Sequence, residues 1–258
     1  MSSAAELESA SVAIAGRAVL DCASLAVGPG EVVGVVGANG AGKTTLLRAA
    51  LGLVRLTAGG ARLGGWPLGD LSELQRAGLA GYLPQERRVA WNMPAWRIVA
   101  LGAAHASPRE ARRRALTALD EMGLAELAER GVRDMSGGER ARVLIARLLA
   151  TEAPFLVADE PAAGLDPDAA LRIMEVLRHR AAGGAAVIAT LHDLTLAARG
   201  CDRLAVMSGG RIVALGPPRE ALSAKVLAQA FGLEGGLVDT PAGWVVAARR
   251  VGFMESGG

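Results

Sequence analysis

The stretch EVVGVVGANGAGKTTLLRAALGL, from Glu31 to Leu53, decides the fold. Its first part is a β-branched run typical of a buried strand, and its last part has the pattern of a helix. Between them, GANGAGKT matches G-x-x-x-x-G-K-[ST] at Gly37, Gly42 and Lys43-Thr44. A strand, a glycine-rich loop and a helix in this order predict a phosphate-binding loop at the edge of an α/β sheet.

The residue types in this loop explain the chemistry that we expect of it. Glycines let the backbone approach phosphate groups closely, and the N–H groups at the start of a helix attract anions. Lys43, one of only two lysines in the chain, would neutralise the β- and γ-phosphates, while the hydroxyl of Thr44 would coordinate Mg²⁺. The loop predicted to bind the nucleotide consists of Gly37, Ala38, Asn39, Gly40, Ala41, Gly42, Lys43, Thr44 and Thr45.

Further short β-branched runs, FLVAD, AAVIATL and RLAVM, alternate with helical patterns along the chain. This alternation predicts a mostly parallel sheet with helices between its strands. Residues 91–150 show little strand signal and are predicted to form a helical insert. We therefore expect one domain over residues 1–258, with an α/β core at 1–90 and 151–258 and a helical part at 91–150.

One helix of this insert has clear start signals in SPREARRRALTALDEMGL. Ser107 is the expected N-cap, Pro108 the first helical residue and Glu110 the capping-box partner. The three arginines at 112–114 are expected on the solvated side of the helix.

Composition reduces the range of functions that the chain could have. Half of the 258 residues are apolar, the formal net charge is +2 and aromatic residues make up 3%. A nearly balanced charge with few stacking rings argues against nucleic-acid binding. The sequence has neither a signal-peptide pattern nor a run long enough to span a membrane, so we expect a soluble cytoplasmic protein. Cys22 and Cys201 lack metal-site spacing and are expected to be buried small hydrophobic residues.

Two acidic residues follow the apolar run that ends at Ala158. Carboxylates at the carboxyl end of a parallel strand lie where α/β sheets bind ligands. Asp159 is placed to hold Mg²⁺ through its water shell, and Glu160 to take a proton from the water that attacks the γ-phosphate. Adjacent acids are also common where ordinary loops begin, but their pairing with the lysine loop favours the catalytic interpretation.

His192 follows another predicted strand and should lie at the same edge as Lys43 and Glu160. An imidazole there could donate a hydrogen bond to the γ-phosphate. The other two histidines, His105 and His179, are expected at the surface or the edge of the core, without a role.

A second glycine-rich segment before a predicted helix lies in MSGGERARVLIARLLA, residues 135–150. We call it the second glycine device. Ser136 as N-cap and Glu139 three residues later form a predicted capping box. A capping box does not require two consecutive glycines, and Gly137 and Gly138 leave backbone N–H groups open to a ligand outside the helix. The question is why one chain would carry two anion cradles.

The order of motifs suggests an answer. A lysine loop, the glutamine of YLPQERR, SGGE, FLVADE, GLD and a histidine follow one another, and over nearly the whole chain this order resembles the nucleotide-binding subunit of ATP-binding-cassette (ABC) transporters. The resemblance implies an α/β P-loop NTPase fold with an antiparallel β edge and a helical signature subdomain. It also implies a head-to-tail dimer, in which each ATP lies between one subunit's lysine loop and the other's Ser136, Gly137 and Gly138.

The same resemblance suggests roles for three other residues and reveals one departure. Gln85 would contact Mg²⁺ or the attacking water and sense the γ-phosphate, Asp166 would lie at the subunit interface, and His192 would be the switch histidine. Ile14 stands where the family usually places an aromatic ring against adenine, so adenine would be held by apolar contact alone, with weaker choice between nucleotides.

The region after Gln85 suggests a membrane partner. In this family a groove near the glutamine receives a short helix of the membrane subunit, and Trp91, Met93, Trp96 and Ile98 could form its apolar anchors. Alternatively, these side chains fill the core of the helical insert; we expect at least one tryptophan at the interface.

The sequence of this region, and two stretches near the C-terminus, ALGPPREALSAKVLAQAFGLE and TPAGWVVAARR, are similar to ATPases of importers for iron-siderophore complexes, haem and cobalamin. Such a subunit would sit peripherally on the cytoplasmic side of the inner membrane, bound to separate transmembrane permease subunits and served indirectly by a periplasmic or extracellular substrate-binding protein. Two alternatives remain: a soluble ABC ATPase of a non-transport assembly complex, and a P-loop kinase in which SGGE is only a capping box.

Overall fold

The computed structural model describes residues 3–86, 89 and 91–251. Its strands are β1 (Ala5–Ile14), β2 (Arg17–Val27), β3 (Val32–Gly37), β4 (Ala58–Leu63), β5 (Trp66–Pro67), β6 (Ala80–Leu83), β7 (Phe155–Ala158), β8 (Ala186–Thr190), β9 (Arg203–Ser208), β10 (Arg211–Gly216), β11 (Leu233–Val238) and β12 (Val245–Arg250). The α-helices are α1 (Lys43–Ala50), α2 (Glu73–Leu79), α3 (Ala95–Ala100), α4 (Pro108–Glu121), α5 (Gly137–Leu149), α6 (Pro167–Ala182), α7 (Leu194–Gly200), α8 (Pro218–Ala221) and α9 (Ala224–Phe231). Short 3₁₀ turns lie at η1 (Leu68–Asp70), η2 (Leu101–Ala103), η3 (Ala125–Leu127) and η4 (Val132–Asp134).

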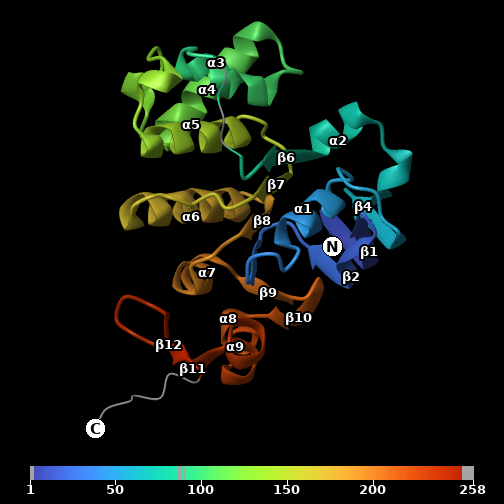
Figure 1. Cartoon of the computed structure of the whole chain (residues 1–258). Helices are drawn as coiled ribbons and strands as arrows, with labels where there is room; N and C mark the ends of the chain where they lie inside the picture. The colour runs from blue at the N-terminus through green and yellow to red at the C-terminus, as the bar shows by residue number, and fades with distance from the viewer. Residues whose placement is uncertain (1–2, 87–88, 90, 252–258) are drawn as a thin grey trace.

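A six-stranded sheet in the order β10-β9-β3-β8-β7-β6 forms the centre of the molecule (Figure 1). The strands from β9 to β6 pair in parallel, and β10 adds an antiparallel edge. A separate antiparallel sheet, in the order β2-β1-β4-β5, lies beside α1. The predicted α/β class with a mostly parallel core and antiparallel edges is confirmed.

Strand β3 is buried on both faces, which explains its run of β-branched residues. Val32 and Val36 belong to the larger core, together with residues of α5, α6 and α7, whereas Val33 and Val35 belong to a second core with α1 and the antiparallel sheet. At Gly34 a Cβ atom would come within 2.7 Å of the Cys201 Sγ atom, so glycine is required for this packing. Cys201 is buried as predicted, but the prediction for Cys22 is wrong, because its side chain is exposed on β2.

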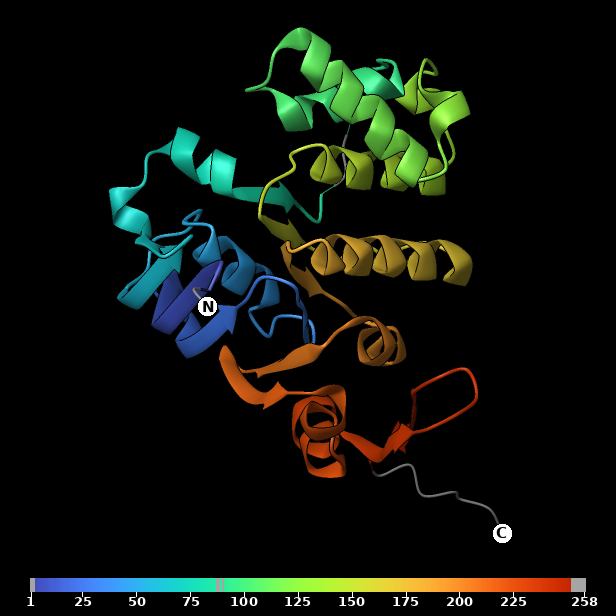
Figure 2. The same cartoon turned by 180° about the vertical axis from the view of Figure 1, so that it is seen from behind.

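Helices α3, α4 and α5 lie together at one end of the molecule, as both views show (Figures 1 and 2). Within residues 91–150 the described backbone forms helices, 3₁₀ turns and one isolated bridge between Pro94 and Gly131. The apolar faces of the three helices join the larger core through residues such as Ile98, Leu119 and Ile145. The predicted lack of strands in this part of the chain is confirmed.

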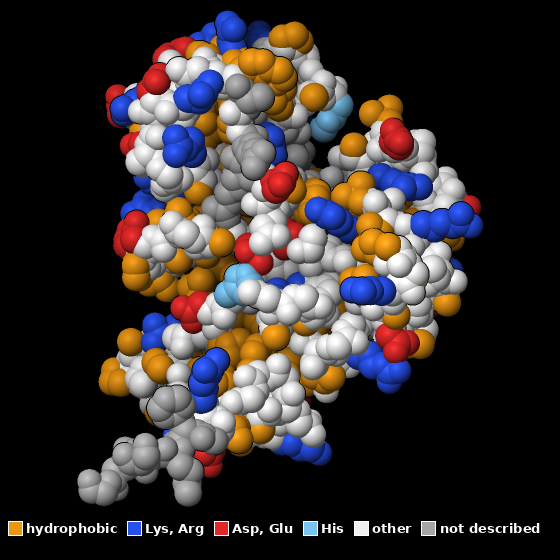
Figure 3. Space-filling view, in the orientation of Figure 1, with side chains coloured by type: hydrophobic (Ala, Val, Ile, Leu, Met, Phe, Trp, Pro, Cys, Tyr) orange, Lys and Arg blue, Asp and Glu red, His pale blue; other side chains and the backbone are white. Residues whose placement is uncertain are grey.

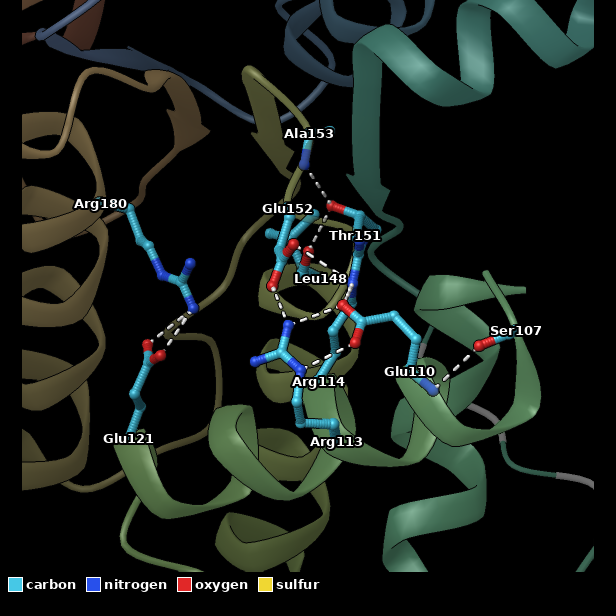
Figure 4. Close-up of polar contacts among 10 residues, drawn as sticks. All are labelled: Ser107, Glu110, Arg113, Arg114, Glu121, Leu148, Thr151, Glu152, Ala153 and Arg180. Atoms are coloured by element: carbon cyan, nitrogen blue, oxygen red, sulfur yellow. Dashed lines mark hydrogen bonds and ion pairs between the residues drawn. The ribbon is translucent and has the colours of Figure 1, made fainter. Parts of the chain in front are cut away.

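Ion pairs join α4 to the segments beside it (Figure 4). Ser107 caps α4 by accepting from the Glu110 N–H group, as predicted, but the Glu110 carboxylate pairs with Arg113 and Arg114. Arg114 also pairs with Glu152 at 3.2 Å, and its side chain is only 20% exposed. The prediction that all three arginines are solvated is therefore wrong for Arg114, because two carboxylates hold it against the turn after α5.

The C-terminal part adds α8, α9 and a two-stranded hairpin of β11 and β12 beside α7 (Figure 1). No helix among the described residues is long and apolar enough to span a membrane.

Candidate active site

The glycine-rich loop connects the end of β3 to the start of α1, as predicted. Gly42 is the residue before α1, and its φ of 99° lies in the left-handed region that favours glycine. A Cβ atom there would lie 2.7 Å from the carbonyl oxygen of Val19. The loop is thus closely packed against β2 and leads into the start of α1, a position that suits an anion.

Lys43 lies folded back over this loop. Its Nζ atom donates hydrogen bonds to the carbonyl oxygens of Gly37, at 2.9 Å, and Ala38, at 3.2 Å. Lys43 is only 7% exposed. Burial lowers the pKa of the Lys43 amine, and the carboxylates of Glu160 and Asp159 oppose this change. The buried cation is therefore fixed in front of two acidic residues at the end of a neighbouring strand.

Asp159 follows β7 directly and is fully buried. Its Oδ1 atom accepts a hydrogen bond of 2.7 Å from the Thr190 hydroxyl, whereas its buried Oδ2 atom has no hydrogen-bond partner. A buried carboxylate oxygen without a partner is costly, and a divalent cation would satisfy it. No group of three or more His, Cys, Asp or Glu ligands occurs among the described residues. The Asp159 carboxylate suits Mg²⁺, which keeps several waters and binds substrate phosphates. Thr44 and Gln85, the other predicted Mg²⁺ ligands, line the neighbouring cavity, whereas Asp159 is not among its lining residues.

Thr190 is a site residue that the sequence reasoning missed. It ends β8 and is fully buried. Its Oγ1 atom accepts a 2.7 Å hydrogen bond from the Glu160 N–H group while donating to Asp159. One hydroxyl therefore links the two acids to the neighbouring strand. The available signal was a polar residue at the end of the apolar run AAVIAT, two positions before His192.

Glu160 and His192 meet in front of the sheet. The Glu160 Oε1 and His192 Nε2 atoms lie 2.5 Å apart. Glu160 has a φ of 53°, which is unusual for a residue other than glycine. Such backbone strain concentrates at functional sites because the surrounding structure must maintain it. At Glu160 the hydrogen bond to Thr190 contributes to this support.

A cavity of about 460 Å³ brings most of the predicted residues together. Its lining includes the loop residues 39–45, Gln85, Glu160 and His192. Gln85 lies after β6 and is exposed, so its side chain is accessible from this cavity. Acidic and histidine side chains gather near the middle of this face, where the surface is hollowed (Figure 3). The arrangement combines an anion-binding loop, a buried cation, a candidate metal ligand and a candidate base.

The second glycine device does not join this cavity. Of the residues that the structure describes, those lining the cavity do not include Ser136, Gly137, Gly138 or Asp166. Ser136 forms the predicted capping box, in which its hydroxyl accepts from the Glu139 N–H group and the Glu139 carboxylate accepts from the Ser136 N–H group. The hydrogen bond from the Ser136 N–H group to the carboxylate, followed by the Ser136 side chain, holds the pKa of the Glu139 carboxyl below its usual value. The capping box is thus complete within one chain, and Ser136 and Gly137 are exposed.

Leu165, the residue before Asp166, packs near Gly138. The Asp166 side chain caps α6 by accepting a 2.9 Å hydrogen bond from the Ala169 N–H group. A Cβ atom at Gly138 would lie 3.8 Å from the Leu165 side chain, next to Asp166 in the chain. Asp166 thus has a local role as a helix cap, and its predicted position at a subunit interface stays a prediction.

The apolar side chains after Gln85 could bind a membrane partner or fill the core of the helical part, and the structure does not give the same answer for all of them. Ile98 is buried in the larger core, and Met93 and Trp96 pack against it. The Trp96 indole also donates to Glu129 and lies beneath the Arg112 guanidinium. Trp91 is 71% exposed and remains the candidate for a partner contact. Ile14, at the end of β1, is 51% exposed, which keeps it available to a nucleotide base.

Comparisons with known proteins agree with this geometry. The family model for ABC transporters matches residues 20–163. The hemin import ATP-binding protein HmuV of Nocardia farcinica is 42% identical over 219 residues, covering 83% of this chain and 76% of the relative. The cobalamin import ATP-binding protein BtuD of Halobacterium salinarum (strain ATCC 29341 / DSM 671 / R1) is 40% identical over 225 residues, covering 85% of this chain and 56% of the relative. Among solved structures, the dimeric ATP-binding cassette MJ0796 in a post-hydrolysis state with ADP and Pi matches with a TM-score of 0.74 and 26% identity, covering 83% of this chain and 99% of that one.

Proposed function

The chain belongs to the ABC transporter family and is an ATPase, and we propose that it energises a membrane importer for haem, cobalamin or an iron-siderophore complex. The observation that carries the proposal is the cavity that unites Lys43, Gln85, Glu160 and His192. The names of the two import relatives support the class of cargo.

In the proposed mechanism, the residues around the cavity divide the work of hydrolysis. Lys43 and the amide groups of the loop bind the ATP phosphates. Thr44, Gln85 and Asp159 would hold Mg²⁺, which supplies positive charge to the phosphates when it is bound. Glu160 accepts a proton from the attacking water, and the nearby His192 ring orients this carboxylate.

A second copy of the chain completes each site. The Ser136 hydroxyl uses one lone pair to accept from Glu139, and its own proton can be donated to an incoming phosphate. The N–H groups of Gly137 and Gly138 open α5, where intrahelical partners are lacking. Because this cradle lies outside the chain's own cavity, it serves the γ-phosphate on a partner in a head-to-tail dimer, with Asp166 at the interface. The dimeric form of a structural relative supports this arrangement.

The remaining proposals concern the assembly. The chain is a single ATPase domain with an α/β core at 1–90 and 151–258 and a helical part at 91–150. It binds separate permease subunits at the cytoplasmic side of the inner membrane as a peripheral protein, and Trp91 is the candidate anchor. A substrate-binding protein outside the membrane delivers the cargo to the permease.

The test of the catalytic assignment is Glu160→Gln. This variant should bind ATP and keep the dimer closed, but its turnover should stop because an amide cannot accept the proton. Glu175→Gln, an exposed position on α6, is the matched control and should hydrolyse ATP normally. Normal turnover by Glu160→Gln would contradict the assignment.

A pull-down from gently solubilised native membranes tests the transport role. A polytopic permease recovered in stoichiometric amount supports the importer. Recovery with cytosolic partners alone contradicts it and favours an assembly ATPase.

A further inference from the structure

The C-terminal hairpin of β11 and β12 lies far from the nucleotide loop in the sequence but contacts the helix that follows His192 (Figure 1). Helix α7 begins two residues after His192. Asp193 caps it, because its Oδ1 atom accepts from the N–H groups of Thr195, at 2.8 Å, and Leu196, at 3.0 Å. The backbone at His192 is therefore tied directly to the first turn of α7.

Two polar side chains of α7 bind the main chain of the hairpin. Thr195 Oγ1 accepts a hydrogen bond of 3.1 Å from the N–H group of Val246. Arg199, one helical turn further on, donates from Nε to the carbonyl oxygen of Trp244 at 2.7 Å. Residues four apart lie on the same face of a helix, so the start of β12 holds one face of α7 at two points.

The hairpin is itself fixed to the body of the protein. The Arg219 guanidinium of α8 lies over the Trp244 ring at 4.5 Å from its centre. The turn before β12 is closed by Thr240, which donates from its hydroxyl to the Gly243 carbonyl at 2.6 Å. Trp244 and Val246 also pack against the larger core. The hairpin is therefore fixed relative to the core, and its hydrogen bonds to Thr195 and Arg199 fix α7 in turn.

A cavity of about 340 Å³ lies between α7 and the start of α6. Glu160 and His192 line it, and so do Thr195 and Arg199. Leu196, Ala197 and Ala198 anchor the buried face of α7 in the larger core. The hairpin supports the partly buried face that carries Thr195 and Arg199, beside the cavity. Loss of that support would let the start of α7, and His192 with it, move relative to Glu160.

We infer that the C-terminal hairpin, acting through α7, holds His192 within hydrogen-bonding distance of Glu160. Thr195 and Arg199 are then positioning residues for ATP hydrolysis. The inference rests on the role of His192 in the proposed function. Neither residue lines the cavity of the glycine-rich loop; each acts by fixing the helix that begins directly after His192 and its neighbour Asp193.

Thr195→Val in the full chain tests the inference, since valine keeps the shape of threonine but cannot accept the Val246 hydrogen bond. We expect kcat for ATP to fall about fivefold, the factor that corresponds to one hydrogen bond, with unchanged ATP affinity. Thr195→Ser keeps the acceptor and should restore kcat. Arg249→Gln removes an exposed ion pair with Glu234 elsewhere on the hairpin and should leave kcat unchanged.

A second readout separates positioning from catalysis. The chain has three histidines, so the imidazole resonances can be assigned with single substitutions and followed by NMR. In Thr195→Val the His192 resonances should move, while those of His105 and His179 stay. Unchanged His192 resonances overturn the inference whatever the turnover. Moved resonances in a chain whose His192→Ala variant still hydrolyses ATP normally would refute the proposed role of His192, and with it the inference about turnover.

Discussion

Replacing Thr190 with valine should damage both stability and turnover, because one buried hydroxyl serves two acidic residues. Valine retains the shape of the side chain and removes the 2.7 Å hydrogen bonds to the Glu160 N–H group and the Asp159 carboxylate. Asp159 would then lack a partner for Oδ1 as well as Oδ2. Asp159 is fully buried, and an abandoned buried group costs about 1–3 kcal/mol. The lost hydrogen bond of the partly buried Glu160 N–H group adds to this cost. That loss is a large part of a typical folding free energy of about 5–15 kcal/mol.

Urea unfolding followed by tryptophan fluorescence measures the loss, and ATP turnover of the folded protein measures its effect on the site. Thr151→Val is the matched control: the Thr151 hydroxyl also bridges two groups, donating to the Leu148 carbonyl and accepting from the Ala153 N–H group (Figure 4). Both groups are neutral main-chain groups of residues that do not line the cavity, so the control should lose less stability and keep its turnover. Equal stability losses in the two variants, or normal turnover by Thr190→Val, would refute the reasoning.

Three other perturbations have defined outcomes. Gly42→Ala should lower Tm and ADP affinity more than Gly40→Ala, since a Cβ atom at 42 would meet a carbonyl oxygen at 2.7 Å, whereas at 40 nothing lies within 4 Å; equal effects would contradict this. Hydrogen bonds from two arginines lower the pKa of Glu110 from 4.5 to about 2. The ionised Glu110 carboxylate therefore stabilises the fold fully above pH 4.5, and this stabilisation is lost toward pH 2. The Tm difference between the wild type and Glu110→Gln should shrink as the pH falls across that window rather than stay constant. Burial raises the pKa of Cys201 to about 12, so a thiol reagent at neutral pH should label only Cys22 in the folded chain and both cysteines in urea.

The sequence predicted the parts of the site whose position follows from local rules. A strand, a glycine loop and a helix determine where Lys43 lies, and parallel strands place their carboxyl ends at one edge of a sheet. Gln85, Glu160 and His192 each follow a strand of the same sheet, so their convergence on one cavity could be expected before the structure was known.

Contacts between segments distant in the sequence could not be predicted in this way. The pairing of Arg114 with Glu152 depends on how α4 packs against the turn after α5, which no local pattern encodes. Thr190 fits the composition of a strand equally well whether its hydroxyl binds a neighbouring main-chain group or an acid. The support of α7 by the hairpin likewise depends on hydrogen bonds between residues about 50 positions apart, namely 195 with 246 and 199 with 244.

Ser136 shows why a correct local interpretation can leave function undecided. The capping box around Ser136 and Glu139 is complete within one chain, so the needs of α5 alone account for both side chains. The glycines at 137 and 138 are different, since glycine is a poorer helix former than alanine and both lie in the first turn of α5. A Cβ atom at Gly137 would meet nothing within 4 Å, so packing inside the chain does not demand glycine there. A destabilising residue type without an internal reason indicates an external one: the close approach of a ligand to the backbone. We propose that this ligand is the nucleotide on a second copy of the chain, which would explain why Ser136, Gly137 and Gly138 lie outside the chain's own cavity.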